Sequence, residues 1–348
     1  MELLVLILGL TNLLANSAYS SIAPFFPLEA LRKGIAEGLI GFIFSIYSVS
    51  KVIASPLIAQ MMGKTGRKPI LLGGLLLEGV ATVSFGLIES IDDALWFGLL
   101  SALCRLIMGL GNACLATASY ALVASHYPAK VDRVVSTLQG FTGLGMTLGP
   151  VLGSGLYAWG GFTLPFYSTG VALLLFLIVV ALALPKNTDR QTPASWRSPT
   201  SPSFQEGNLT VFTLLRYVKI SIILSAVGLS ILQLVMKEPI LQVRVIQLGI
   251  SEQLAGMFFA FEVVAFMATS IVLSCIDRKH KNLDLILLFS ILGPIVGYFL
   301  GGPIHWLGVP ESVIPLSIGM LFNGACGALA INTAVAAIIE YKKDKFWR

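Results

Sequence analysis

Charged residues and histidines are scarce in this chain, and their scarcity excludes several classes of protein. Only 12% of its 348 residues are charged and 56% are hydrophobic, whereas roughly 25% of a soluble domain is charged. Its three histidines lie near predicted loops, and no two have the spacing of metal ligands. No glycine-rich loop follows a predicted strand, which argues against a nucleotide site. We therefore expect neither an enzyme nor a bound metal or cofactor.

What the chain has instead is a series of long apolar runs. About 20 apolar residues are needed to cross the hydrocarbon core of a bilayer as a helix. About ten runs meet this length: residues 3–26, 38–62, 69–88, 95–125, 136–158, 162–184, 212–236, 251–275, 283–302 and 312–339. All four cysteines fall inside these runs, so no disulfide framework is indicated. The pattern predicts an all-α, multi-pass membrane protein.

The first run has a second interpretation, as a cleaved signal peptide. It opens with Glu2 rather than with a basic segment, and it continues through Tyr19 and PFFP without a convincing cleavage site. We interpret it as a retained first span.

Basic residues gather in loops on one side of the expected topology. The net charge is +5, and with residue 1 in the cytoplasm most Lys and Arg fall on the cytoplasmic face, as the positive-inside rule requires. The opposite loops are acidic and contain Glu89, Asp92, Asp93, Glu252 and Glu311. Because topology explains the basic charge, we expect the lipid bilayer as a partner and no nucleic acid.

A polar segment divides the chain into two parts. Residues 185–211 are rich in Ser, Thr and Pro and are predicted to form a flexible cytoplasmic linker. An N-terminal bundle of spans 1–6 (residues 1–184) precedes it, and a partial C-terminal bundle of spans 7–10 (residues 212–348) follows. Short basic loops in corresponding positions of the two parts, GKTGRKP and DRKHK, indicate a weak internal repeat.

Arg105 and Lys51 lie near the middle of apolar runs, where a charge needs a physical reason. A charge near the middle of a membrane costs about 2.5–3.5 kcal/mol unless it is paired or hydrated. Arg105 shares one helical face with Met108, Asn112 and Ser119. This face indicates a substrate or proton pathway, the alternative being a structural bridge at a helix end. Lys51 is too central to reach the membrane surface easily, and it is a second candidate for proton coupling.

Glu78, Glu238 and Glu262 are the glutamates of interest within or beside the spans. A carboxylate there can alternate between holding a proton and pairing with an ammonium group, and Pro239 after Glu238 would free backbone carbonyls that also coordinate a cation. Glu238 is therefore the candidate for amine binding, unless it is an interfacial charge beside Lys237. Glu262 is either a second proton site or a bridge to an unassigned base. For Glu78 a structural role is favoured, because it has fewer polar neighbours.

Polar amides occur on the same predicted spans. Asn12 and Asn16 form a polar stripe with Ser20 in the first run. We expect these two amides to line the pathway, together with Asn112 and Asn323.

A stripe of small residues runs along the fifth span. Gly145, Gly149 and Gly153 recur at helical spacing, so a neighbouring helix can approach closely. Pro150 interrupts the stripe and would kink the helix. The combination predicts a gating surface, with ordinary close packing as the alternative.

One cytoplasmic loop resembles a signature of the major facilitator superfamily of transporters. AQMMGKTGRK is similar to the family's G-x-x-x-D-R-x-G-R-K loop, and it matches at Gly66, Arg67 and Lys68. It departs from that pattern at the first glycine, the aspartate and the first arginine. Asp277 and Arg278 retain the acid and base in the corresponding loop of the second half.

Two further motifs occur at the span numbers that the resemblance requires. RLIMGLG, which begins at Arg105, resembles the family's R-x-x-q-G-x-G signature of span four, and GMTLGPVLG, which begins at Gly145, resembles its span-five antiporter signature. The resemblance implies a fold of two six-helix halves with nested repeats.

Within this superfamily the chain resembles the vesicular amine transporter branch, near its polyamine-carrying members. APFFPLEALRKG is similar to the first luminal connection of that branch, and Lys51 matches a lysine of its span two. Glu238 and Pro239 match the acid and proline with which the branch holds cationic amines. Ala15 stands where monoamine carriers have an aspartate. The family normally has about twelve spans, so the acid expected to pair with Lys51 in span eleven is absent.

The resemblance implies a proton-coupled antiporter of organic cations, such as polyamines, that works by alternating access. We expect it in a vesicular or other internal membrane, with the plasma membrane as a further possibility. The alternative is a non-transporting, truncated relative that serves as a membrane scaffold or is a partial gene product.

Overall fold

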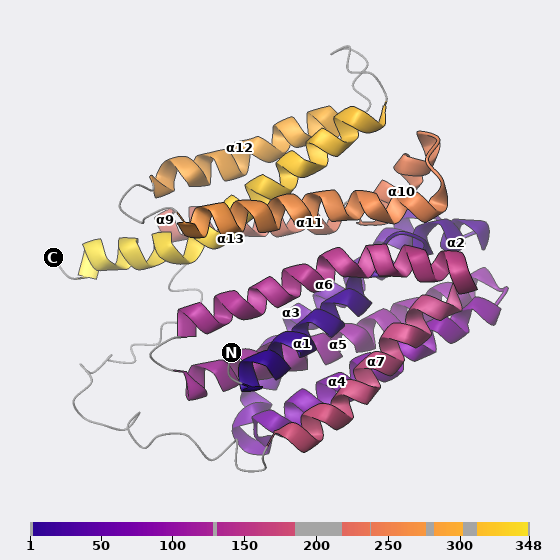
Figure 1. Ribbon diagram of the computed structural model, residues 1–348, viewed down its shortest axis with the longest axis horizontal. Helices are drawn as coiled ribbons and strands as arrows, with labels where there is room; N and C mark the ends of the chain where they lie inside the picture. The colour runs from indigo at the N-terminus through magenta and orange to yellow at the C-terminus, as the bar shows by residue number, and fades with distance from the viewer. Residues whose placement is uncertain are drawn as a thin grey trace. The chain divides into compact units, whose positions relative to one another are not determined.

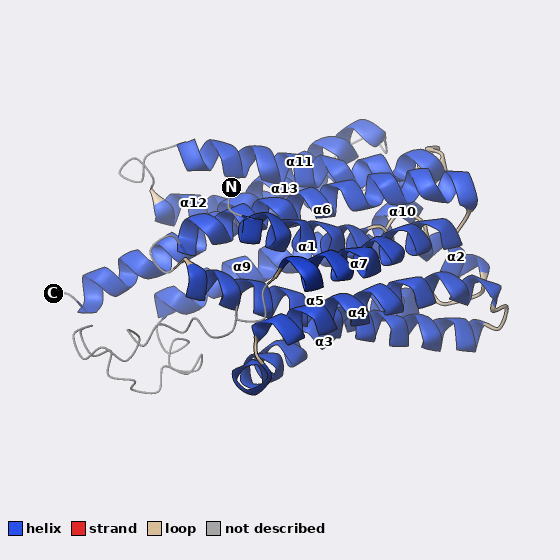
Figure 2. Cartoon of the chain, turned by 60° about the horizontal axis from the view of Figure 1, so that its bottom comes forward, coloured by secondary structure: helices blue, strands red, loops and turns tan. Residues whose placement is uncertain are grey.

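The regular structure of the chain is helical. The computed structural model describes residues 3–127, 131–184, 218–236, 238–275, 282–301 and 312–346. Within these ranges every regular element is a helix (Figure 2). Seven of the described helices are long and apolar enough to cross a membrane, judged by length and composition.

The helices follow the predicted apolar runs. In the order of Figure 1 they are α1 (Leu3–Ser20), α2 (Phe26–Arg32), α3 (Glu37–Thr65), α4 (Arg67–Leu87), η1 (Ile88–Ser90), α5 (Ala94–His126), α6 (Val131–Gly160), α7 (Thr163–Ala183), α9 (Val218–Met236), α10 (Glu238–Gln247), α11 (Glu252–Cys275), α12 (Leu283–Gly301) and α13 (Val313–Phe346). Each predicted run corresponds to one long helix, although α1 ends before the first run does. The elements that the runs did not predict are α2, α10 and the turn η1.

Helix α1 is shorter than the first predicted run, which extends to residue 26. Helix α1 ends at Ser20, a turn follows, and α2 begins at Phe26 with Pro27 in its first turn. A proline is tolerated in the first turn of a helix because the amide that it lacks would have no intrahelical partner there. The turn after Ser20 therefore separates two helices, and the PFFP segment leads into α2 instead of extending the first span.

The chain forms two compact units. The first comprises Met1–Pro193 and Glu238–Phe259, and the second comprises Ala194–Lys237 and Ala260–Arg348. In the first unit, α5 packs against both α3 and α4, while α6 packs against α1, and α7 against α4. In the second unit, α12 and α13 pack together and both contact α9. The predicted linker, residues 185–211, lies outside the described ranges, so the domain boundary stays a prediction.

The predicted loop motif joins α3 to α4. Gly66 has a φ of 90°, a conformation that glycine adopts without the steric cost of a side chain. Arg67 is the first residue of α4. The Lys68 Nζ donates to the carbonyl oxygen of Ala181 at 2.8 Å, and also to that of Leu184. Lys68 thus satisfies carbonyls at the C-terminal end of α7, where a cation is favoured. Asp277 and Arg278 lie outside the described residues.

The glycine stripe of α6 packs against α1. A Cβ atom at Gly149 would lie 2.5 Å from the carbonyl oxygen of Ser17, and one at Gly153 would lie 2.6 Å from that of Ser21. A Cβ at Gly145 would meet the carbonyl oxygen of Leu13. The stripe therefore lets two backbones of the first unit meet closely. Pro150 lies within α6, and the gating role of this segment stays a prediction.

Substitution at Gly153 tests this packing. Gly153→Ala should lower the thermal unfolding midpoint in detergent, because the new methyl group would press on a backbone oxygen that cannot rotate away. The matched control is Gly155→Ala, since a Cβ at Gly155 meets nothing within 4 Å. The control should be neutral or stabilising by up to about 1 kcal/mol, the helix preference of alanine over glycine. Equal effects of the two substitutions would contradict the packing.

Candidate functional site

A buried charge cluster lies inside the first unit. It consists of Lys51 on α3, Glu78 on α4, and Arg105 and Asn112 on α5. Glu78 and Arg105 are 0% exposed and Asn112 is 3% exposed, while Lys51 is partly buried. Arg105 and Asn112 are seven residues apart and therefore share one helical face. Since α5 packs on both α3 and α4, this face brings charges from three helices together.

Two glycines of α5 set the spacing of these helices. A Cβ atom at Gly111 would lie 2.7 Å from the backbone nitrogen of Glu78, and a Cβ at Gly109 would meet the carbonyl oxygen of Tyr47. The Ser50 Oγ donates to the carbonyl oxygen of Leu106 at 2.8 Å, which links α3 to α5. The glycines of the RLIMGLG motif thus allow α3 and α4 to approach α5 at the level of the charges.

The Glu78 carboxylate is weakly hydrogen-bonded for a buried charge. The Asn112 Nδ2 donates to its Oε1 at 3.3 Å and to its Oε2 at 3.4 Å, beyond the usual 2.7–3.2 Å range of N–H···O bonds. Lys51 and Arg105 are both close enough to interact with the carboxylate electrostatically. Among the described residues, no ion pair joins Glu78 to either base. The charges therefore influence one another without being locked in contact.

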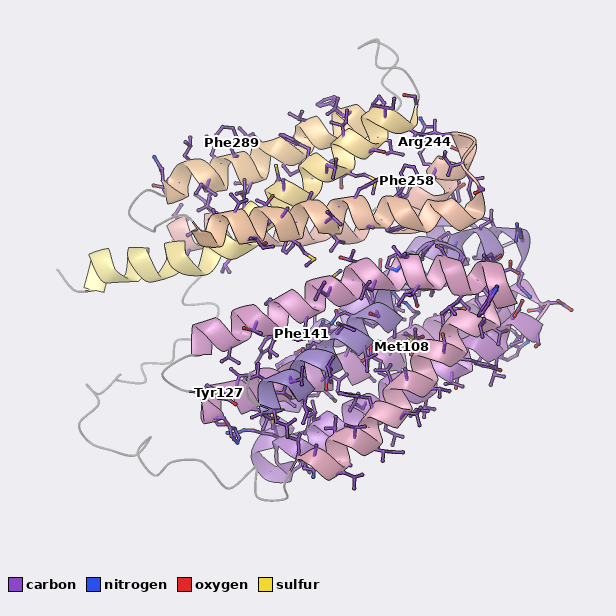
Figure 3. The ribbon with its side chains drawn as sticks, viewed as in Figure 1. Met108, Tyr127, Phe141, Arg244, Phe258 and Phe289 are labelled. Atoms are coloured by element: carbon purple, nitrogen blue, oxygen red, sulfur yellow. The ribbon has the colours of Figure 1, made fainter. Side chains whose placement is uncertain are left out.

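Arg105 lies in a box of aromatic rings. Its guanidinium carbon is 4.7 Å from the ring centroid of Tyr47, 5.0 Å from that of Tyr19 and 5.4 Å from that of Phe44. None of its three guanidinium nitrogens has a hydrogen-bond acceptor among the described residues. Met108, one turn further along α5, is also fully buried, and Figure 3 places it inside the first unit. Cation–π contacts of this kind contribute about 0.5–2 kcal/mol each and compensate part of the lost hydration.

The predicted polar stripe of α1 is buried as well. The Asn12 Nδ2 donates to the carbonyl oxygen of Leu8 at 2.8 Å and to the Ser119 Oγ of α5 at 3.4 Å. The Asn16 Nδ2 donates to the carbonyl oxygen of Asn12 at 2.7 Å. These amides are largely satisfied along their own helix, and their predicted role in lining a pathway is a proposal.

A second polar group lies in the second unit. Glu262 on α11 is 6% exposed, and Asn323 on α13 is 4% exposed. A Cβ at Gly324 would meet the carbonyl oxygen of Glu262, which shows that α11 and α13 approach closely. Tyr298 of α12 interacts electrostatically with Glu262. Glu238 begins α10, but its side chain lies outside the described part of the structure.

The proximity of Glu78 to Lys51 is not predicted from the sequence. A partner for Lys51 was expected in span eleven, and Glu78 was interpreted as structural. The structure instead brings Glu78 from the neighbouring α4 into electrostatic range of Lys51. No spacing rule connects the two residues, because they lie on different helices, α3 and α4, which pack against each other and against α5. The one available signal was a carboxylate in an otherwise apolar run.

The sequence model of the Major Facilitator Superfamily matches residues 8–343. The chain belongs to this superfamily. It is therefore a multi-pass membrane transporter and not an enzyme, and the expected fold class is confirmed.

Related proteins agree with this assignment. The chain is 27% identical over 322 residues to the MFS-type transporter SLC18B1 of Rattus norvegicus, covering 92% of this chain and 68% of the rat protein. It is 32% identical over 174 residues to the Homo sapiens protein of that name, covering 50% of this chain and 38% of the human one.

Solved structures show the same fold at lower sequence identity. A D-xylose-proton symporter matches with a TM-score of 0.69 and 19% identity, over 97% of this chain and 88% of the symporter. A bacterial homolog of the human lysosomal transporter Spinster matches with a TM-score of 0.68 and 15% identity, over 96% of this chain and 74% of that protein.

Replacement of Arg105 tests the aromatic box. Arg105→Lys keeps the charge but replaces the flat, weakly hydrated guanidinium by a strongly hydrated ammonium. It should destabilise the folded protein in detergent by about 1–2 kcal/mol, the scale of a desolvated cation–π contact. The control is Arg32→Lys on α2, because the Arg32 side chain is 50% exposed and this substitution should change stability by less than about 0.5 kcal/mol. Similar losses in both variants would show that the box does not hold Arg105.

Proposed function

We propose that the chain is a proton-coupled antiporter of organic cations, such as polyamines, in a vesicular or other internal membrane. The observation that carries the proposal is the buried charge cluster, in which a carboxylate and two bases are enclosed within the first unit of a major facilitator chain. Charges buried in membrane-spanning helices are costly and commonly mark substrate or proton pathways. The resemblance of Glu238 and Pro239 to the amine-holding pair of the vesicular amine transporters supports a cationic substrate.

The proposal assigns roles to separate groups. Glu238 binds the ammonium group of the substrate. Asn12, Asn16, Asn112 and Asn323 line the pathway and offer hydrogen bonds to the substrate. A neutral amide can bind an amine without adding a charge that would repel it or hold it too tightly.

Proton coupling and gating involve other residues. Proton coupling is assigned to Arg105, Lys51 and Glu262. The two bases bias the protonation of nearby carboxylates, and Glu262 is itself a buried carboxylate that can take up a proton. The α6 segment with Gly145, Gly149, Pro150 and Gly153 is the proposed gating surface. Alternating access in this family depends on such a movement of one helix group against another.

A proton gradient supplies enough free energy for this exchange. One pH unit corresponds to about 1.4 kcal/mol per proton, and a potential of 100 mV adds about 2.3 kcal/mol per elementary charge moved. A compartment with an acidic interior could therefore accumulate a cationic amine many-fold. The proton would leave the compartment as the amine enters.

Uptake into proteoliposomes tests the function. Purified chain in liposomes with an acidic interior should accumulate labelled spermidine, and a protonophore should abolish the accumulation. Glu238→Gln keeps the side-chain size but removes the charge, so it should lose most of this uptake. The control is Glu37→Gln, because Glu37 is an exposed carboxylate at the start of α3. Full uptake by Glu238→Gln would remove that residue from the mechanism, and no uptake by the unsubstituted chain would contradict the function.

A further inference from the structure

We propose that Glu78 binds and releases the proton that is exchanged for the amine, and that Arg105 is the base that pairs with its carboxylate once the proton has left. This inference rests on the proposed function, because it names the proton site of that exchange. The residues proposed above for proton coupling include two bases and Glu262, but no carboxylate of the first unit. Glu78 is the carboxylate of the first unit that we assign to proton coupling.

The surroundings of Glu78 stabilise neither protonation state fully. A carboxylate that stays charged in a protein interior normally accepts two or three strong hydrogen bonds. Glu78 is 0% exposed, and its described hydrogen bonds come from one amide at 3.3 and 3.4 Å. A fully neutral acid, on the other hand, would leave Lys51 and Arg105 without a nearby negative charge. Such a group can be switched between its two states by a modest change in its surroundings.

Arg105 has the unused hydrogen bonds that the second state needs. Its guanidinium is held by ring faces, and its three nitrogens have no acceptors in the described part of the chain. A guanidinium can donate two parallel hydrogen bonds to one carboxylate. A movement of α4 along α5 that brings the carboxylate to the guanidinium would exchange a cation held by rings for a bidentate ion pair with Glu78. The close contact at Gly111 places the backbone of α5 against that of α4 beside Glu78, so the position of α4 along α5 sets the separation of the carboxylate and the guanidinium.

The other helices around Glu78 add few competing charges. Of the helices that pack against α4, α3 contributes Lys51, while α5 contributes Arg105 and the thiol of Cys114, which lies within electrostatic range of Glu78. Helices α1 and α7 contain no Asp, Glu, Lys, Arg or His. The remaining charges of α4 itself, Arg67 and Lys68, are at its first turn. Protonation at this level therefore depends on one carboxylate and two bases.

The proton step balances without any additional reactant. On the acidic side, the Glu78 carboxylate takes a proton from water and becomes a neutral acid, while Arg105 stays in the aromatic box. On the opposite side, the acid returns the same proton to water and the carboxylate pairs with Arg105. One proton crosses the membrane in each cycle, and the amine crosses in the opposite direction.

Two assays on Glu78→Gln separate proton coupling from amine binding. The first is gradient-driven accumulation of spermidine with the membrane potential clamped at zero, where one exchanged proton gives about tenfold accumulation per pH unit. The second is spermidine counterflow without a pH gradient, which needs no proton. Glu78→Gln should lose the roughly tenfold accumulation of spermidine per pH unit and keep counterflow. Glu37→Gln should keep both activities. Accumulation at the level of the unsubstituted chain would overturn the proposal.

A spectroscopic readout tests the proton site whether or not spermidine is the substrate. The infrared difference spectrum of the purified protein between acidic and alkaline pH should contain a band from a buried protonated carboxyl group, and Glu78→Gln should lack that band. An unchanged band overturns the proposal. A chain that shows the Glu78 band but moves no spermidine contradicts the proposed function alone.

A conservative variant covers the case in which Glu78→Gln does not fold. Glu78→Asp keeps a carboxyl group but withdraws it from Asn112 and Arg105 by one methylene group. The pH at which its infrared band disappears should therefore differ from that of the unsubstituted chain. An identical titration in Glu78→Asp would also overturn the proposal.

Discussion

The mutual compensation of charges inside the first unit is the constraint on which the rest of the structure depends. Removing one member of a buried charge group leaves the others uncompensated, which typically costs about 3–5 kcal/mol. Glu78 and Arg105 are both fully buried, and Lys51 lies within electrostatic range of Glu78. The three charges come from three different helices. The fold must therefore hold α3, α4 and α5 close together before any of these charges is tolerable.

Close packing of the helices around the charges meets this requirement. Gly109 and Gly111 let the backbones of α3 and α4 approach α5. In the same way, the α6 glycines let the backbone of α1 approach α6. The family motif that contains Arg105 thus combines a charge with the small residues that allow its neighbours to reach it. This combination gives a physical reason for the spacing of the motif, which a charge alone would not need.

Much of the fold could be predicted from the sequence, because apolar length and helical periodicity are local properties. Each long apolar run forms a helix, and the face of α5 that contains Arg105, Met108, Asn112 and Ser119 is buried as expected. The break after Ser20 was missed, because apolar residues recur after Ser21 and extend the run to Phe26. The proximity of Glu78 to Lys51 was also missed, since it depends on which helices pack together. The roles predicted for Glu238, Glu262 and Asn323 stay predictions.

The most direct test of this account is a double-mutant cycle between Lys51 and Glu78, measured as the free energy of unfolding in detergent. Lys51→Met and Glu78→Gln each remove one charge and keep much of the side-chain volume. Each single variant should be destabilised, and the double variant should be destabilised by less than the sum, with a coupling of about 0.5–3 kcal/mol. Additive effects within about 0.3–0.5 kcal/mol would show that the two charges do not compensate each other, which would contradict the account.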